Sequence, residues 1–143
     1  MPNYRRYYIS HAPVFVTVVT KNRTPWLIDH VDQLLNAMSR AKQKYPYKHI
    51  AHVILPDHFH WLFSLTGERS LSVSVNTVKS FSAREINRIL RRHGGVWQRG
   101  FYDRAIRREE NLKHVARYIV ANPLRAGIVG SIGEYPFWDM KWL

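Results

Sequence analysis

The hydrophobic pattern of the chain predicts three β-strands in its first half. Residues 14–20 are rich in β-branched side chains and form the first expected strand. Residues 48–55 and 58–65 are two further apolar runs. Pro56 and Asp57 separate these two runs, so we expect them to form a hairpin.

Three other stretches have the three-four spacing of helices. The first extends from Asp29 or His30 to about Tyr45, and Pro46 ends it. Its expected buried face consists of Val31, Leu34, Leu35, Met38 and Ala41. The second covers about residues 71–92 before Gly94-Gly95, and its inner stripe consists of Val75, Val78, Ser82, Ile86 and Ile89. The third covers about residues 109–122, since Pro123 disfavours helical geometry in the residue before it.

A short strand is expected at residues 104–107, before the last helix. The order strand, helix, strand, strand, helix, strand predicts an α+β fold of the ferredoxin-like or RRM-like kind, a split βαββαβ unit with an antiparallel sheet. Two helices would cover one sheet face and leave the other open, with an extra C-terminal helix across or beside it. The tail, residues 127–143, is expected to pack as irregular structure through Trp138 and Trp142.

The third expected strand contains two histidines separated by one residue, His58 and His60. Residues i and i+2 of a strand lie on one face, so both imidazoles would project together and could hold one divalent ion. Phe59, Trp61 and Phe63 would then project into the core on the opposite face.

Composition narrows the class of protein. The 143 residues suit one domain, and the absence of cysteine excludes disulfides, thiolate zinc sites and cysteine nucleophiles. No apolar run reaches the roughly 20 residues of a membrane span, and residues 1–6 lack the apolar stretch of a signal peptide, so we expect a cytoplasmic protein. A net charge of +12 favours polyanions. Nucleic acid fits better than an acidic membrane, because aromatic residues are interleaved with the basic ones and no amphipathic membrane helix stands out.

Tyr118 and Asn122 lie four residues apart on the last expected helix and would share a face. Asn122 offers an amide oxygen, and Tyr118 offers a phenol that can act as a nucleophile. Two imidazoles and an amide oxygen suit Mg²⁺, Mn²⁺ or a similar ion. The set predicts a phosphodiester-cleaving site with a metal and an oxygen nucleophile.

Four segments of the chain resemble the HUH single-strand endonucleases and their branch of REP-associated tyrosine transposases, and they follow one another along the chain in the order usual for that branch. His58-Phe59-His60 is similar to the histidine-hydrophobic-histidine motif, and the segment from Tyr118 to Gly127 is similar to the single-tyrosine signature. The other two segments are residues 1–6, with Phe15, Thr17 and residues 23–27 downstream, and residues 96–103 leading to Ile106-Arg107. Residues 10–14 and Arg104 depart from the common pattern of the branch, so the specificity for a DNA sequence does not transfer.

The resemblance implies that residues 1–143 form a single HUH transposase domain. It implies that His58, His60 and Asn122 are metal ligands and that Tyr118 is the nucleophile. The implied reaction is cleavage of single-stranded DNA next to a hairpin of a repetitive extragenic palindrome (REP), which leaves a 5′-phosphotyrosine and a free 3′-OH. A monomer is favoured over a homodimer.

Further residues are candidates for contacts with DNA. They are Arg5, Arg6, Lys79, Arg84, Arg88, Trp97, Arg99, Arg104 and Arg107. A solvated helix face explains Lys79, Arg84 and Arg88 almost as well, and Trp97 suits core anchoring as well as base stacking. His114, four residues before Tyr118, is an accessory candidate or an exposed neighbour.

Three other functions fit parts of the pattern. An RRM-like binding module would read single strands with aromatic residues on the open face, but here the histidines would lie on that face. A phosphodiesterase that uses water would keep its activity in Tyr118→Phe. A domesticated transposase would bind hairpins or single strands without cleaving them.

Overall fold

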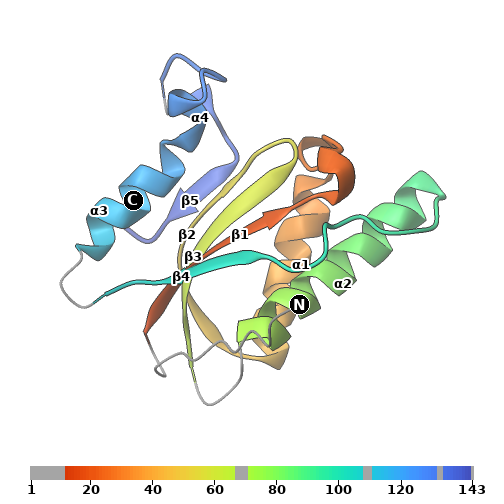
Figure 1. The fold of residues 1–143 in the computed structure, drawn as a ribbon, viewed down its shortest axis with the longest axis horizontal. Coiled ribbons are helices and arrows are strands. Elements are labelled where there is room, and N and C mark those ends of the chain that lie inside the picture. Colours follow the sequence, from red (N-terminus) through yellow and green to blue (C-terminus); the bar gives the residue numbers. More distant parts are fainter. Residues whose placement is uncertain (1–11, 67–70, 108–110, 132–133, 143) are drawn as a thin grey trace.

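The computed structural model describes residues 12–66, 71–107, 111–131 and 134–142, and a five-stranded antiparallel sheet runs through these residues (Figure 1). The strands lie in the order β4-β1-β3-β2-β5. Their bounds are β1 Pro13–Val19, β2 Tyr47–Ile54, β3 His58–Leu65, β4 Tyr102–Ala105 and β5 Trp138–Met140. The first four strands in chain order have the ferredoxin-like arrangement that the hydrophobic pattern predicts.

Helices α1 (Val31–Lys44) and α2 (Leu71–Leu90) pack on one face of this sheet (Figure 1). Phe59, Trp61 and Phe63 are fully buried beneath them, as their alternation along β3 predicts. Two residues expected on the inner helix faces are instead partly exposed, Leu35 at 37% and Ile89 at 43%. Each lies at the edge of its apolar stripe, beside positions that are buried.

The second sheet face is covered in part near β2, by the extra C-terminal helix that was expected across or beside it. Helix α3 (Leu112–Val120) packs there through Ala116, Ile119 and Val120, which form a second core with residues such as Val53 and Leu62. A short helix, α4 (Asn122–Arg125), follows it (Figure 1). Pro123 was expected to end the last helix, but its fixed φ and missing N–H also suit the first turn of a new one.

The tail is not irregular throughout, because its residues 138–140 form β5 beside β2. Ile54 N donates a hydrogen bond to Phe137 O (2.9 Å), and Tyr135 Oη donates one to Ile54 O. Three residues are too few to produce a readable alternation, and the free edge of β2 supplies the partner. The other strand difference is β4, which lies two residues before its expected position.

Two histidines on β2 share the face that carries α1 and α2. A break in register between His49 and Ala51 places His49 opposite Phe63 and His52 opposite Trp61. A hydrogen bond of 2.9 Å joins His49 Nε2 to His52 Nδ1, and His49 Nδ1 lies 3.9 Å from Asp139 Oδ2 on β5. Burial, followed by the charge of His49, lowers the pKa of His52 to about 4.

We therefore expect the free energy of unfolding to fall as the pH is lowered from about 6.5 to about 4. In this window the unfolded chain binds a proton at His52 that the folded chain does not, because its folded pKa is about 4. One such proton costs up to about 1.4 kcal/mol per pH unit, and the loss is absent above pH 6.5. Urea unfolding at pH 7.5, 6 and 5 measures it. A His52→Gln variant should have a shallower slope, and an unchanged slope would contradict the assignment.

Candidate metal and nucleophile site

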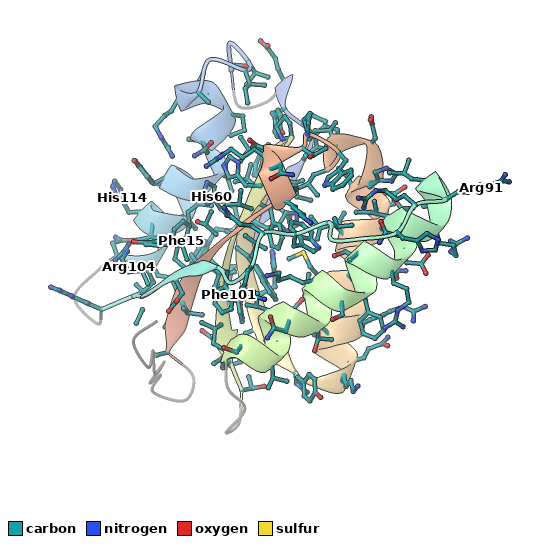
Figure 2. All side chains as sticks on the ribbon, turned by 45° about the vertical axis from the view of Figure 1, so that its right-hand side comes forward. Phe15, His60, Arg91, Phe101, Arg104 and His114 are labelled. Carbon is teal, nitrogen blue, oxygen red and sulfur yellow. The ribbon has the colours of Figure 1, made fainter. Side chains whose placement is uncertain are left out.

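His58 and His60 lie side by side at the start of β3, on the sheet face opposite α1 and α2. Their ring centroids are 4.9 Å apart and the ring planes are inclined by 78°. Figure 2 shows His60 close to Phe15 of β1, whose ring stacks on the imidazole at 5.4 Å. The shared face that strand alternation predicts for the two histidines is therefore present.

The Nδ1 atom of each histidine is held by a neighbouring side chain. His60 Nδ1 lies 2.8 Å from Thr17 Oγ1, and His58 Nδ1 lies 2.7 Å from Asp57 Oδ1. Such contacts hold each ring in place and leave its Nε2 as the atom that could bind a metal. Metal-binding histidines usually have their second ring nitrogen hydrogen-bonded in this way, so the arrangement of His58 and His60 fits a metal-binding pair.

Asn122 approaches His60 from α4. Its Nδ2 lies 3.4 Å from His60 Nε2. The oxygen and nitrogen of an amide exchange places by a 180° rotation, so Oδ1 can occupy this position instead. No group of three His, Cys, Asp or Glu side chains that could hold a metal occurs in the described part of the chain, so an amide or water would have to complete the set. Two imidazoles and an amide oxygen fit a Mg²⁺ or Mn²⁺ ion by their chemistry.

The electrostatics of the site keep His60 neutral. Burial, then the charges of His58 and Arg125, lower the pKa of His60 to about 4. For Asp57, burial alone would raise the pKa, but hydrogen bonds from His58 and Arg23 outweigh it and lower the pKa below its usual range. The neutral imidazole of His60 is ready to donate an electron pair to a metal at neutral pH.

Tyr118 lies on α3 and its side chain is 62% exposed. The Arg125 guanidinium carbon lies 3.6 Å from the centre of its ring, and Arg125 Nη1 donates a hydrogen bond to Tyr118 O. Tyr118 and Asn122 are not on one continuous helix, because α3 ends at Val120 and α4 begins at Asn122. Arg125 joins the two segments, so an exposed phenol is held by a stacked cation.

Sequence reasoning missed three residues of this site: Thr17, Asp57 and Arg125. Thr17 could have been found only from the register of β1 on β3, which pairs it with His60. Asp57 was interpreted as a turn residue, although an acid adjacent to a ligand histidine is a recognisable signal. Arg125 was assigned to the tyrosine signature without a role.

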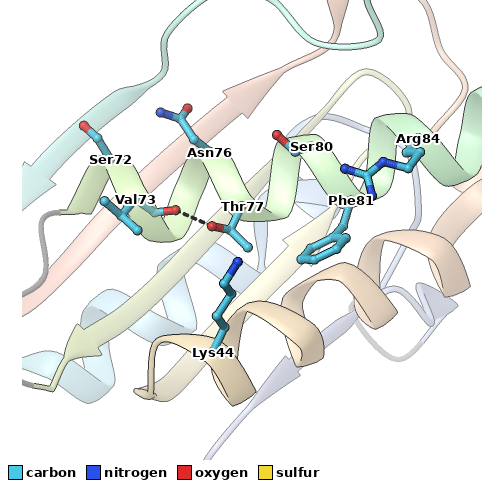
Figure 3. A pocket seen from close by; sticks show the side chains of 8 residues that line it. All are labelled: Lys44, Ser72, Val73, Asn76, Thr77, Ser80, Phe81 and Arg84. Atoms are coloured by element: carbon cyan, nitrogen blue, oxygen red, sulfur yellow. Dashed lines mark hydrogen bonds between the residues drawn. The ribbon is translucent and has the colours of Figure 1, made fainter.

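The predicted DNA contacts do not all gather at this site. Arg5 and Arg6 lie outside the described residues. Arg84 and Arg88 lie on α2, across the sheet from His60, where Arg88 pairs with Glu85 at 2.8 Å. Figure 3 shows Arg84 with Phe81 and Lys44 at a groove of about 420 Å³ between α1 and α2.

The remaining basic candidates lie around β4 and the loop before it. Lys79 Nζ donates hydrogen bonds to Gln98 O (2.8 Å) and Gly100 O (2.9 Å). Arg99 and Arg107 are exposed, as is Arg104, which is paired with Phe15 across the sheet. His114 is exposed on α3 (Figure 2), which fits either of the two roles expected for it.

Trp97 is a core residue, so of the two interpretations that the sequence left open, its burial favours core anchoring over base stacking. Its side chain is 8% exposed, and its ring packs edge-on against Phe59 at 5.5 Å. Its Nε1 donates a hydrogen bond of 2.9 Å to Ser82 Oγ of α2. A ring that is buried on this scale offers no face on which a base could stack.

Comparison with known proteins connects this geometry to a family. The family described as "Transposase IS200 like" matches residues 8–122. A REP-associated tyrosine transposase of Escherichia coli K12 is 32% identical over 139 residues, which cover 96% of this chain and 81% of that protein. A protein of Haemophilus influenzae, whose name also places it among the REP-associated tyrosine transposases, is 30% identical to this chain over 148 residues. The match covers 96% of this chain and 84% of that protein.

A solved structure agrees with the sequence comparisons. The structure of a REP-associated tyrosine transposase bound to a REP hairpin superposes with a TM-score of 0.84 at 29% identity. The match covers 96% of this chain and 82% of that one.

The helices in the described part of the chain include none with the length and the apolar composition of a membrane span.

Replacement of Trp97 by Phe should destabilise the protein by about 1–2 kcal/mol, because it removes the indole hydrogen bond to Ser82 and leaves a small void. Ser82 Oγ keeps its bond to Val78 O, so no buried hydroxyl is left unpaired. Urea unfolding measures the loss. Full stability together with weakened DNA binding would restore Trp97 as a DNA contact.

Proposed function

Because the chain belongs to the IS200-like transposase family, and within it to the REP-associated tyrosine transposases, we propose that it cuts and rejoins single-stranded DNA next to REP hairpins through a covalent bond to Tyr118. The observation that carries the proposal is that His60 lies beside His58 on one side and contacts Asn122 on the other, with an exposed phenol on the adjoining helix. The basic charge of +12 supports a polyanionic substrate.

The proposed step exchanges one phosphoester bond for another. Tyr118 gives up its phenolic proton, and its Oη forms a bond to the scissile phosphorus. The bond from phosphorus to the 3′ oxygen breaks, and that oxygen takes up a proton to become a free 3′-OH. The downstream strand remains attached as a 5′-phosphotyrosine, and attack by a 3′-OH reverses the sequence and rejoins the DNA.

The residues around Tyr118 would prepare this step. Arg125 stacks on the ring and keeps a positive charge beside the point where the phosphate would bind. His58, His60 and Asn122 would hold the divalent ion, Mg²⁺ or Mn²⁺, which would neutralise charge on a non-bridging phosphate oxygen. Thr17 and Asp57 keep the two imidazoles oriented toward it.

A covalent-adduct assay tests the nucleophile. Wild-type protein, incubated with Mn²⁺ or Mg²⁺ and a labelled REP hairpin with single-stranded flanks, should retain label after denaturation, and EDTA should abolish the adduct. Tyr118→Phe should bind the same DNA but form no adduct, with Tyr102→Phe as a control, since Tyr102 is also an exposed tyrosine but lies on β4. An adduct in Tyr118→Phe, or cleavage without any adduct, would contradict the mechanism. Tight binding without cleavage would favour a hairpin-binding protein.

Thr17→Val tests the metal site without relying on cleavage. The change removes the partner of His60 Nδ1 but keeps the shape of the side chain, and loss of such an outer contact typically weakens metal binding by about 10–100-fold. Titration of Mn²⁺, followed by the electron paramagnetic resonance signal of the free ion, measures affinity directly. Thr77→Val on α2 is the matched control, because Thr77 donates to Val73 O on the opposite layer. Equal Mn²⁺ affinity in Thr17→Val and the wild type would refute the proposed role of Thr17.

A further inference from the structure

A basic cleft, separate from the histidine and tyrosine site, lies at the end of the sheet where β1 ends and β3 begins. It is a cleft of about 510 Å³ between the turn after β1, the loop before β4 and α2. Four cationic side chains line it and no carboxylate does. Its lining residues are Lys21, Asn22, Arg23, Lys79, Gly95, Trp97, Gln98 and Arg99.

The two loops that form the cleft are tied to each other by their backbones. Lys21 N donates to Val96 O (2.9 Å), and Gln98 N donates to Val19 O (2.8 Å). The turn itself, η1 (Lys21–Arg23), contains left-handed backbone at Asn22 (φ 56°) and Arg23 (φ 53°). Backbone of that kind is unfavourable for arginine and persists where the surrounding structure imposes it. The cations are therefore carried on a preformed frame.

Arg23 joins this cleft to the candidate catalytic site. Its Nη1 lies 3.2 Å from Asp57 Oδ2, and the other oxygen of the same carboxylate lies 2.7 Å from His58 Nδ1. The Arg23 side chain is nevertheless 66% exposed. A guanidinium has five N–H donors in a planar fork, so the bond to Asp57 leaves donors that can face a phosphate.

We propose that the cleft binds phosphates of the single strand that leads away from the cleavage point, with Arg23 shared between Asp57 and one of these phosphates. The inference rests on the proposed function, which supplies the strand. Backbone contacts suit the lining better than base recognition, because the one aromatic ring there, Trp97, is 8% exposed and bonded to Ser82. The site is thus indifferent to sequence and holds the strand by charge.

The test is a binding measurement in which cleavage cannot occur. All proteins carry Tyr118→Phe and are assayed in EDTA. The variant is Lys21→Gln/Arg99→Gln, and the control is Arg40→Gln/Lys44→Gln, which removes the same charges from α1. Two DNAs are compared, a REP hairpin with single-stranded flanks and the same hairpin without them.

We expect the cleft variant to bind the flanked hairpin at least ten-fold more weakly than the control does, and to bind the hairpin without flanks equally well. The slope of log K against log salt is negative, and two lost phosphate contacts should make it less steep by about 1.4, at about 0.7 per single-strand phosphate. Equal weakening for both DNAs would assign the two cations to the hairpin stem. No weakening for either would leave the cleft without a role. Either result overturns the proposal.

Neutral methylphosphonate linkages locate the contact. When one linkage at a time is substituted along the flank, binding by the control protein should weaken at one or two positions. The same linkages should weaken binding by the cleft variant no further, because the contact is already lost. If the linkage and the protein substitutions each reduce the affinity independently, the proposal is refuted. If wild-type protein forms the covalent adduct but the cleft variant binds the flanked hairpin normally, the proposed role of the cleft is refuted and the proposed cleavage stands. If the cleft variant binds the flanked hairpin weakly but no adduct forms, the proposed cleavage is refuted and the role of the cleft stands.

Discussion

The antiparallel pairing of β1 with β3 is the constraint on which the candidate site depends. Its register places Thr17 opposite His60, so the hydroxyl of one strand meets the ring nitrogen of the other. The same register buries Phe59 under α1 and α2 while His60 faces the opposite side. A slip of one residue would exchange the two faces, placing the imidazoles in the core and the aromatic rings outside. The energy that buries the aromatic row therefore also orients the histidines.

The site balances burial against charge. Burial and neighbouring positive charge both disfavour protonated His60, and the result is an imidazole that is neutral at physiological pH. Asp57 is held ionised by the opposite means, through hydrogen bonds that outweigh its own desolvation. A polyanion approaching this region meets a protein with a net charge of +12, but at His60 it meets a neutral imidazole whose electron pair can bind a cation.

Much of the fold was predictable because the spacing of apolar residues along the chain indicates each strand and helix. The alternation in residues 58–65 predicted β3 within its observed bounds, and the three-four spacing predicted α1 and α2 to within about two residues. What failed depended on contacts between distant segments. Strand β5 pairs with the available edge of β2, and Trp97 is held in the core by its packing on Phe59 and its bond to Ser82, both distant in sequence. Thr17 and Arg125 gained their roles only through register and helix geometry, which no spacing along the chain encodes.

Asp57 shows how a turn residue can serve two sites at once. One carboxylate oxygen orients His58, and the other holds Arg23, which lines the basic cleft. An amide in this position would keep one acceptor and lose the charge that attracts both partners. Because one carboxylate makes both contacts, the basic cleft and the histidine pair are joined through a single side chain, over distances of 3.2 and 2.7 Å. A substitution at Asp57 would therefore disturb the orientation of His58 and the position of Arg23 together.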